Sequence, residues 1–525
     1  MAADSRDMPP VRLLPDAELA RLALAAPLLD HAARLARWTA PKVGVNATAE
    51  LVEDELARAT AALGFGDDPE GAARTAEAWA FAVDTGLVEV ELDEDTTRAE
   101  DLDAPAGTAS PGKALGLLDG GDPREVIEVW RTGLESVLTE TASAGLADLF
   151  GDADDQDATG AAIDGADEDG WDGDGPAWDP REEAAFLEGA LGNLYLLTAL
   201  EEAGPAQGAS AEDGGEGVKP VPLPVLAASM VVPDDMDVPT DAVLEEVSEA
   251  MMRLDDHFRL LAPTGLVDYQ PVDDALIAEE AAAEVPGESP EAPADLATEL
   301  AADEVSRYGM VRLTPLGVLG VRERLLEHGV PAPVVGDLAG ASADRLLDAL
   351  VSYPQAAAYE EGGRWLERRS PVDAARELLA AARGDGPDAP ARRLTCQQTL
   401  GRLGPEAEPA LREVLDDREL GGLARVWLVE RGATDVPAPD EAMVFWLTVD
   451  TLAAQLAMDD DPELLGELVR DLVARHDGFF DAVWRVDHPA TAEVLDAMGR
   501  LHPDKRTAKE ARKAAFKARS KAPRG

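Results

Sequence analysis

An acidic stretch between residues 151 and 180 raises the question of calcium binding, because carboxylates are closely spaced along it. Its carboxylates crowd around one glycine, in the order Asp164, Asp167, Asp169, Gly170 and Asp172. A calcium-binding EF-hand loop needs oxygen ligands at positions 1, 3 and 5, glycine at position 6 and a bidentate acid at position 12. With Gly170 at position 6, Gly165 and Pro176 would occupy positions 1 and 12. Two required ligands are missing, so the spacing predicts no calcium site.

The same stretch, residues 151–180, has no basic residue, but it contains two tryptophans, Trp171 and Trp178. A segment with so little apolar surface cannot offset the entropy lost on ordering, so we predict a disordered linker. Exposed aromatic residues on an acidic tether can form a linear motif that folds on a partner. The alternative is that the segment only tethers the elements on either side of it.

Histidine and cysteine, the other common metal ligands and catalytic groups, are few and scattered. The single cysteine, Cys396, excludes an intrachain disulfide and a cysteine-based zinc cluster. The histidines form no HExxH motif and no pair at i, i+4; they are His31, His257, His328, His476, His488 and His502. The GxSxG motif and the phosphate-binding patterns GxGxxG and GxxxxGK[ST] are also absent. The sequence therefore predicts no catalytic, metal or cofactor site and a protein that is not an enzyme.

The last 21 residues, 505–525, are charged oppositely to the rest of the chain, with nine basic residues against Glu510. The candidate contact residues are Lys505, Arg506, Lys509, Arg512, Lys513, Lys517, Arg519 and Lys521. Their spacing predicts a basic helix that contacts RNA, DNA or an acidic protein surface. The alternative, which we favour, is an electrostatic clamp onto the acidic body of the same chain. Because only alanines and Phe516 could be buried, we expect this tail to be peripheral to the folded core.

The composition of the 525-residue chain bounds its fold and its partners. The formal net charge of −59, from 105 acidic and 46 basic residues, repels phosphate groups, so we do not expect binding to anionic membranes, or to nucleic acid except through the tail. Hydrophobic residues make up 46% of the chain but aromatic residues only 4%, which favours close-packed helices. No apolar run reaches about 18 residues and no leader pattern is present, so we expect a cytoplasmic protein.

Residues 13–140 show the order of elements found in a winged-helix domain, followed by one further helix. The predicted elements are a helix pair at Asp16–Trp38 broken at Pro27, a loop at Lys42–Asn46, helices at Thr48–Gly64 and Pro69–Val83, a positive-φ turn at Gly86 and a strand from Leu87. Three helices followed by a strand predict a first winged-helix-like unit.

Residues 218–332 predict a second such unit. The block Thr264–Val267 repeats the letters TGLV of Thr85–Val88, so a true duplication and a chance match both stay open. Further on, YGMVRLTPLGVLGVRERLLE at Tyr308–Glu327 predicts a strand, an N-cap at Thr314 and an amphipathic helix. A strand, an LTPLG corner and a helix resemble the closing segment of a winged-helix domain. Residues 273–300 would then be an insertion in the wing.

The rest of the chain is predicted to be helical or flexible. We assign residues 181–203 to a connecting helix, 204–217 to a flexible linker, 333–503 to a helical region and 504–525 to the basic tail. Within the helical region, LGPEAEPALREVLDDRELGGLARVWLVERG at Leu403–Gly432 resembles a HEAT-type repeat of two antiparallel helices. A generic helical bundle is the alternative. The predicted fold class is thus mainly α, with two winged-helix-like units followed by a HEAT-like region.

Taken together, these segments resemble uncharacterised actinobacterial proteins that combine winged-helix-like units with HEAT-like helices, a resemblance that implies architecture and no activity. We therefore expect a non-enzymatic interaction or scaffold protein that binds another protein. The alternative is a winged-helix transcriptional regulator with recognition helices at Pro69–Val83 and Thr240–Leu261. The cationic candidates for DNA contact on these helices are Arg74, Arg253, His257 and Arg259.

Overall fold

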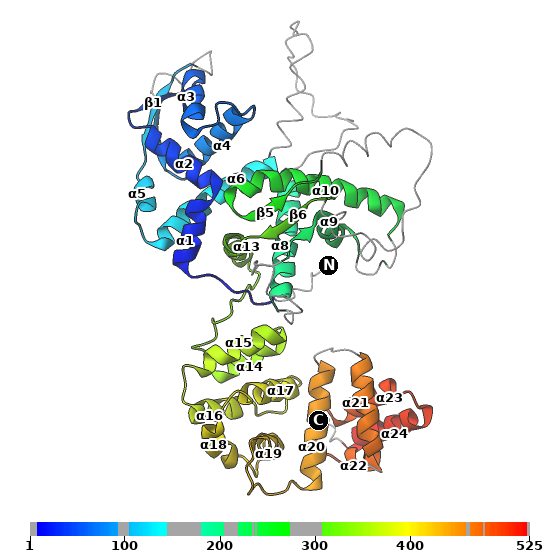
Figure 1. Ribbon diagram of the computed structural model, residues 1–525. Helices are drawn as coiled ribbons and strands as arrows, with labels where there is room; N and C mark the ends of the chain where they lie inside the picture. The colour runs from blue at the N-terminus through cyan, green and yellow to red at the C-terminus, as the bar shows by residue number, and fades with distance from the viewer. Residues whose placement is uncertain are drawn as a thin grey trace, which may run out of the picture. The chain divides into compact units, whose positions relative to one another are not determined.

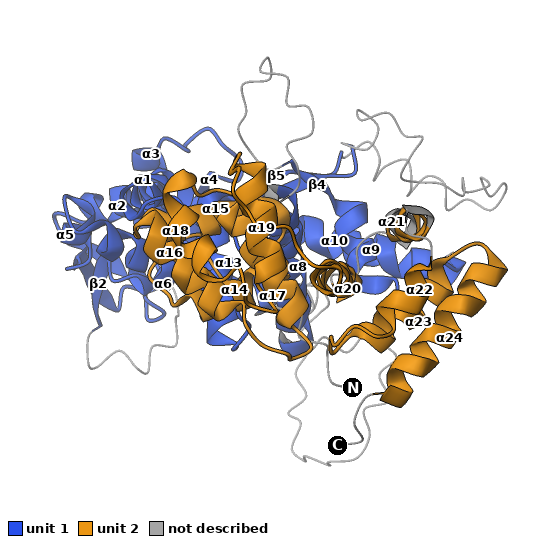
Figure 2. Ribbon diagram, turned by 90° about the horizontal axis from the view of Figure 1, so that it is seen from below, with its two compact units in different colours: residues 1–202, 210–332 blue, residues 203–209, 333–525 orange. Residues whose placement is uncertain are grey.

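The computed structural model describes residues 8–92, 104–143, 180–203, 219–233, 236, 239–273, 307–457, 462–475 and 478–521. These residues are mainly helical, as predicted, and include two three-stranded antiparallel sheets (Figure 1). The chain divides into two compact units (Figure 2): unit 1 is Met1–Glu202 with Ser210–Ala332, and unit 2 is Ala203–Ala209 with Pro333–Gly525. The predicted linkers at 151–180 and 204–217 and the predicted insertion at 273–300 lie outside the described residues, apart from Pro180 and Asp273.

The first half of unit 1 is built around a sheet with the strand order β1-β3-β2. Its elements are α1 (Asp16–Ala25), α2 (Pro27–Trp38), β1 (Val43–Val45), α3 (Glu53–Leu63), α4 (Gly71–Asp84), β2 (Val88–Leu92), β3 (Gly107–Pro111), α5 (Leu115–Leu118) and α6 (Pro123–Ser143). The predicted break at Pro27 is confirmed, because proline occupies the first position of α2 and Ala26 before it is extended.

Two details of this half correct the predictions. The segment Lys42–Asn46, predicted as a loop, contains strand β1, which pairs with β3 in the register Val43 to Ala109. Three residues are too short to show a strand period in the sequence. The helix predicted to start at Thr48 begins only at Glu53, as α3. Thr48 instead donates its backbone N–H and its hydroxyl to the side chain of Asn46.

The second half of unit 1 repeats this order of elements. Its sheet has the strand order β4-β6-β5, in which the last strand again lies in the middle. Its elements are α8 (Pro180–Ala203), β4 (Val221–Pro222), α9 (Leu223–Val231), α10 (Asp241–Leu261), the 3-10 turn η1 (Ala262–Thr264), β5 (Val267–Gln270), β6 (Met310–Leu313) and α13 (Pro315–Glu327). In both halves a short strand, two helices and a two-stranded hairpin follow one another.

The two TGLV blocks occupy equivalent places in these halves. Gly86 and Gly265 both have positive φ, +67° and +77°, and each turns the chain from a helix into the first hairpin strand. The leucines that follow them are almost fully buried. The carbonyl oxygen of Leu87 accepts a hydrogen bond from Gly112, and that of Leu266 accepts one from Thr314. The sequence match therefore marks a shared local structure.

The predicted corner at Thr314 is confirmed. Its Oγ1 accepts a 2.9 Å hydrogen bond from the backbone N–H of Gly317, which makes Thr314 the N-cap of α13, and the same hydroxyl lies 2.6 Å from the carbonyl oxygen of Gly265, to which it donates. One side chain thus holds the end of the hairpin, the start of the helix and the second TGLV turn together.

Unit 2 consists of helices packed around two apolar cores. The helices are α14 (Ala343–Ser352), α15 (Gln355–Leu366), α16 (Pro371–Ala381), α17 (Ala389–Leu400), the 3-10 turn η2 (Pro405–Ala407), α18 (Glu408–Glu413), α19 (Gly421–Glu430), α20 (Glu441–Ala457), α21 (Pro462–Arg475), α22 (Phe479–Val483), α23 (Thr491–Leu501) and α24 (Lys505–Lys521). One core runs from Leu338 to Leu428, and the other runs from Phe445 to Ala518.

Helix α15 is not predicted by the sequence analysis, because Gly362 and Gly363 in its middle lower its helix propensity. The structure gives these glycines a packing role. A Cβ on Gly363 would lie 2.5 Å from the Arg402 guanidinium, and one on Gly362 would lie 3.5 Å from Thr399. The glycines therefore let α15 approach α17 and the turn after it closely.

Candidate functional site

The basic C-terminal segment forms helix α24, and one face of this helix belongs to the core of unit 2. The alanines on that face are buried: Ala508, Ala511, Ala514, Ala515 and Ala518. They pack against α23, where a Cβ on Gly499 would lie 2.7 Å from the Arg512 side chain. The expectation of a peripheral tail is therefore wrong for this face, because small side chains let two helices pack closely enough to share a core. Phe516, in contrast, is 71% exposed.

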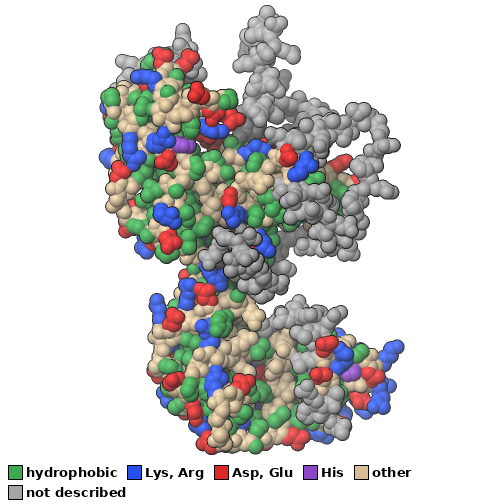
Figure 3. Space-filling model, in the orientation of Figure 1, with side chains coloured by type: hydrophobic (Ala, Val, Ile, Leu, Met, Phe, Trp, Pro, Cys, Tyr) green, Lys and Arg blue, Asp and Glu red, His purple; other side chains and the backbone are tan. Residues whose placement is uncertain are grey.

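The opposite face of α24 is basic and surrounds Phe516. Lys505, Lys509 and Lys513 follow one another every four residues, and all three are exposed. Phe516 comes three residues after Lys513, which places its ring on the same side of the helix. Figure 3 shows Lys and Arg side chains gathered over α24. The helix thus presents an aromatic side chain among cations.

Some of the predicted contact residues are held by unit 2 itself. Lys517 lies 3.6 Å from the Asp481 carboxylate and Arg519 lies 3.3 Å from that of Asp496. The main-chain oxygens of Gly499 and Arg485 accept hydrogen bonds of 2.8 Å from Arg512 and Lys521 respectively, and Arg506 pairs with Glu510 of α24 at 3.7 Å. For Lys505, Lys509 and Lys513, the described residues provide no ion-pair partner. Within the part of the chain that the structure describes, the contacts of α24 with unit 2 therefore lie at the edges of the helix, and these three lysines stand unpaired on its exposed face.

The two tryptophans that form the predicted linear motif, Trp171 and Trp178, lie outside the described residues, as do the aspartates around Gly170. Among the residues that the structure does describe, no group of three His, Cys, Asp or Glu side chains could hold a metal ion.

His488 and Asp450 form a buried pair in unit 2 whose polar atoms are fully used. The Nδ1 atom of His488 accepts a 3.1 Å hydrogen bond from the backbone N–H of Ala490, which leaves Nε2 to donate to Asp450 at 3.0 Å. Arg393 also contacts this carboxylate, at 2.6 to 3.0 Å. The arrangement joins α17, α20 and the turn before α23. With both ring nitrogens engaged, it fits a structural crosslink better than proton transfer.

His257 in unit 1 is a second buried histidine with a charged partner. Its Nε2 lies 2.9 Å from Glu183 of α8, and Arg253 contacts the same carboxylate at 2.5 Å. Burial lowers the pKa of His257, while the Glu183 carboxylate opposes this shift. Two helices distant in sequence, α8 and α10, are thereby tied together. His328 is the C-cap residue of α13.

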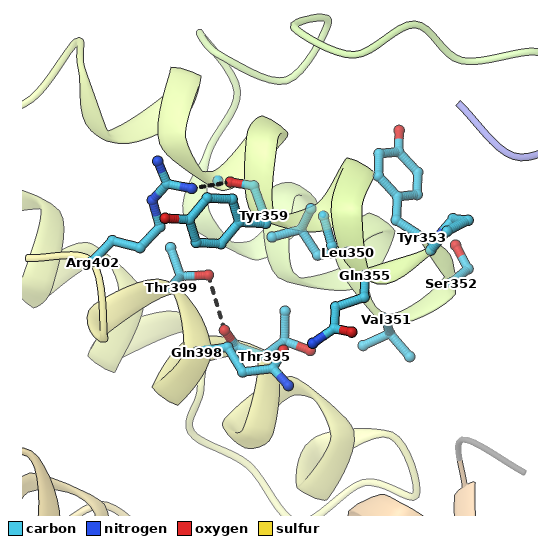
Figure 4. Close-up of a pocket in the computed structure, with 13 residues that line it drawn as sticks. Leu350, Val351, Ser352, Tyr353, Gln355, Tyr359, Thr395, Gln398, Thr399 and Arg402 are labelled. Carbon is cyan, nitrogen blue, oxygen red and sulfur yellow. Dashed lines mark hydrogen bonds between the residues drawn. The ribbon is translucent and has the colours of Figure 1, made fainter. Parts of the chain in front are cut away.

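A hollow of about 650 Å³ opens between α14, α15 and α17 in unit 2 (Figure 4). At one end the guanidinium of Arg402 lies 3.7 Å from the centre of the Tyr359 ring and donates a hydrogen bond to the main-chain oxygen of the same tyrosine. Tyr353 lies at the other end, and burial together with Glu361 raises its pKa to about 12. Arg402 is the one charged side chain among the described residues that line this hollow.

Sequence reasoning missed this hollow because its walls come from segments some forty residues apart, and one wall is the unpredicted helix α15. Neutral amide and hydroxyl groups also line it: Ser352, Gln355, Thr395, Gln398 and Thr399. Such groups can donate and accept hydrogen bonds, but Thr395 and Thr399 already bond to the main chain of α17.

None of the described helices is long and apolar enough to cross a membrane. Comparison of this chain with protein-family models, with curated proteins and with solved structures finds no match in any of the three. The function of this chain is therefore inferred from the geometry of its own residues.

Proposed function

We propose that this chain is a non-enzymatic interaction or scaffold protein that binds an acidic partner protein through the exposed face of α24. The observation that carries the proposal is Phe516, an aromatic side chain that is 71% exposed among lysines on a helix whose other face is buried in a core. Exposed aromatic anchors with surrounding cations are typical of binding surfaces. Because α24 is packed against α23, the surface would be formed before a partner arrives.

The expected strength follows from the groups involved. Burying a Phe side chain contributes about 1.5–3 kcal/mol, and each exposed ion pair adds about 0.2–1 kcal/mol. Lys505, Lys509 and Lys513 could each form one such pair with a partner's carboxylate. The sum, offset by the entropy of association, fits a weak and salt-sensitive complex.

We further propose that both halves of unit 1 are winged-helix-like and that unit 2 contains HEAT-like helix pairs. The shared strand orders β1-β3-β2 and β4-β6-β5, each with two helices before the hairpin, support the first assignment. Successive packing of α16, α18 and α19 supports the second. The single cysteine, Cys396, is buried as a free thiol, which fits a reducing cytoplasm.

The proposed winged-helix-like units suggest a second candidate function, a DNA-binding regulator. The basic side chains of α4 and α10 argue against it, because they already have partners within the chain. Arg74 pairs with Asp68 at 2.9 Å and Arg259 with Asp255 at 2.8 Å. Arg253 contacts Glu183, and His257 is buried beside it. Salt-sensitive binding of duplex DNA that persists after charge reversal at Lys509 and Lys513 would favour this second function instead.

The proposal is tested by photo-crosslinking in cells, with a benzophenone analogue of phenylalanine in place of Phe516. The matched control carries the analogue at Val429, which is 60% exposed on α19 of the same unit. We expect an acidic protein to be crosslinked at position 516 and not at 429, and the adduct to disappear in Lys509→Glu with Lys513→Glu. The same adducts at both positions, or an adduct that survives charge reversal, would overturn the proposal.

A further inference from the structure

A groove of about 730 Å³ runs between α3, α4 and the turn after β1 in unit 1. Helix α4 forms one wall, with Ala76, Ala80 and Val83 at spacings of four and three residues, which places them on one side of the helix. The other apolar lining residues are Ala49, Leu51, Val52, Leu56 and Trp79. The groove therefore offers an apolar strip that follows about two turns of α4, roughly 10 Å in length.

Five carboxylates stand along this groove: Glu50, Glu53, Glu77, Asp84 and Glu140. The described residues that line it include no lysine and no arginine. Glu77 and Asp84 are seven residues apart, so they form an acidic row beside the apolar strip of α4. Burial and the nearby Glu140 carboxylate raise the pKa of Glu77, which means that these negative charges repel one another across the groove.

The turn at one end of the groove is fixed in an unusual conformation. The buried Asn46 side chain accepts hydrogen bonds from the backbone N–H groups of Thr48 and Glu50, at 3.0 and 2.8 Å, and donates to the Glu50 carboxylate at 2.9 Å. Ala49 has φ of +68°, a positive value that no other described residue except glycine shows. Its carbonyl oxygen accepts a 2.8 Å hydrogen bond from Trp79. Backbone strain of this kind tends to be kept at functional sites.

We propose that this groove binds an amphipathic, cationic helix of a partner protein, with leucine or valine side chains on the apolar strip and lysine or arginine opposite Glu77, Asp84 and Glu140. A helix suits the site because the apolar and acidic rows run side by side along α4, as the two faces of an amphipathic helix do. A bare metal ion does not, because the described residues bring no three ligands together. The inference goes beyond the proposed binding surface on α24, because it concerns a second surface, in unit 1, and a cationic partner.

The test measures fluorescence anisotropy of a labelled 18-residue peptide of leucine and lysine, arranged to form an amphipathic helix, with the full-length chain. The comparison peptide has the same composition in an order that gives no apolar face. We expect the amphipathic peptide to bind at least about tenfold more tightly than the scrambled one, because only its apolar face can use the strip on α4. Equal affinities, or no binding of either peptide at low salt, would overturn the inference.

Two pairs of variants then locate the site. Ala76→Arg places a cation in the groove and should weaken binding about tenfold. Its control is Ala242→Arg, which adds the same charge at an exposed position on α10, outside the lining, and should leave binding unchanged. Glu77→Gln with Glu140→Gln should weaken binding about three- to tenfold. The control Glu245→Gln with Glu249→Gln alters two exposed carboxylates on α10 by the same charge. If a variant and its control change the affinity for the peptide equally, the attraction is non-specific and the inference is wrong.

The result of the peptide test can be distinguished from the result of the crosslinking test of the α24 surface. Peptide binding should persist in Lys509→Glu with Lys513→Glu, and a loss there would contradict a site in unit 1. If the peptide does not bind but the crosslink at position 516 forms, the groove inference is wrong and the proposed function stands. If the peptide binds but no crosslink forms, the groove inference stands and the proposed function is wrong.

Discussion

The indole Nε1 of Trp130 donates a 2.7 Å hydrogen bond to the carbonyl oxygen of Thr264, 134 residues further along the chain. Trp130 is fully buried on α6, and Thr264 begins the second TGLV turn. The bond therefore joins the helix that follows the first sheet of unit 1 to the turn that starts the second. It helps to hold the two halves together as one compact unit.

Trp130→Phe should destabilise unit 1. The variant keeps an aromatic ring but leaves the Thr264 carbonyl oxygen buried without its donor, which costs about 1–3 kcal/mol. Hydrogen exchange measured by mass spectrometry should show faster exchange in α6 and around η1. The matched control is Trp365→Phe in unit 2, whose Nε1 donates to Ala341 at 2.9 Å and which should speed exchange there instead. Unchanged exchange in unit 1 would show that the bond adds little.

Gly317→Ala should lower stability although alanine is the better helix former. A Cβ at Gly317 would lie 1.8 Å from the carbonyl oxygen of Leu266, so α13 must move away from the second hairpin. The matched control is Gly192→Ala on α8, where a Cβ meets nothing within 4 Å. There the substitution should stabilise the protein by roughly 0.5–1 kcal/mol. Urea unfolding of both variants measures the difference, and a stabilising Gly317→Ala would contradict the close packing.

The sequence predicts best where a local rule decides the structure. Pro27, Gly86 and Thr314 each fix a break, a positive φ or a cap within a few residues, and all three predictions are confirmed. The strand β1 and the helix α15 were beyond prediction, because a three-residue strand has no period and two glycines contradict helix propensity. In each case the deciding contact comes from a distant segment.

The candidate sites also have features that the sequence predicts and features that depend on distant segments. The lysine spacing that defines the basic face of α24 is visible in the sequence, whereas the burial of the alanines on its other face is not, because it depends on α23. The acidic groove beside α4 forms only because Glu50, Glu77 and Glu140 lie together in the folded chain. These residues come from three segments spread over about ninety residues. Nothing in a single sequence predicts that these three carboxylates lie close together.

Glu77→Gln should raise the melting temperature of unit 1 at pH 7. The pKa of Glu77 is raised in the folded protein from its usual value near 4.5 by burial and by Glu140, so its ionised form costs folding free energy at neutral pH. As the pH falls through the folded pKa toward 4.5, the wild-type carboxyl becomes protonated and this cost disappears. The advantage of the variant should therefore shrink with falling pH. Thermal unfolding followed between pH 7 and 4 measures it, and a variant that is less stable at pH 7 would show that Glu77 has a favourable partner.

Removing residues 505–525 should unfold part of unit 2, contrary to what the sequence alone predicts for a peripheral tail. Five buried alanines leave the core with α24, and at about 0.8 kcal/mol for each buried methyl group their loss amounts to roughly 4 kcal/mol. The deletion also uncovers the side chains of Val494, Leu495 and Met498, which are at most 1% exposed in the intact chain.

The control for this deletion is Lys509→Glu with Lys513→Glu, which reverses charge on the exposed face and should shift the melting temperature by no more than about 1–2 °C. We expect the deleted protein to bind a dye specific for exposed apolar surface and to lose protection against hydrogen exchange in α23. A deletion that melts together with the control would mean that the alanine face adds little to the second core. The sequence-based expectation of a peripheral tail would then be correct after all.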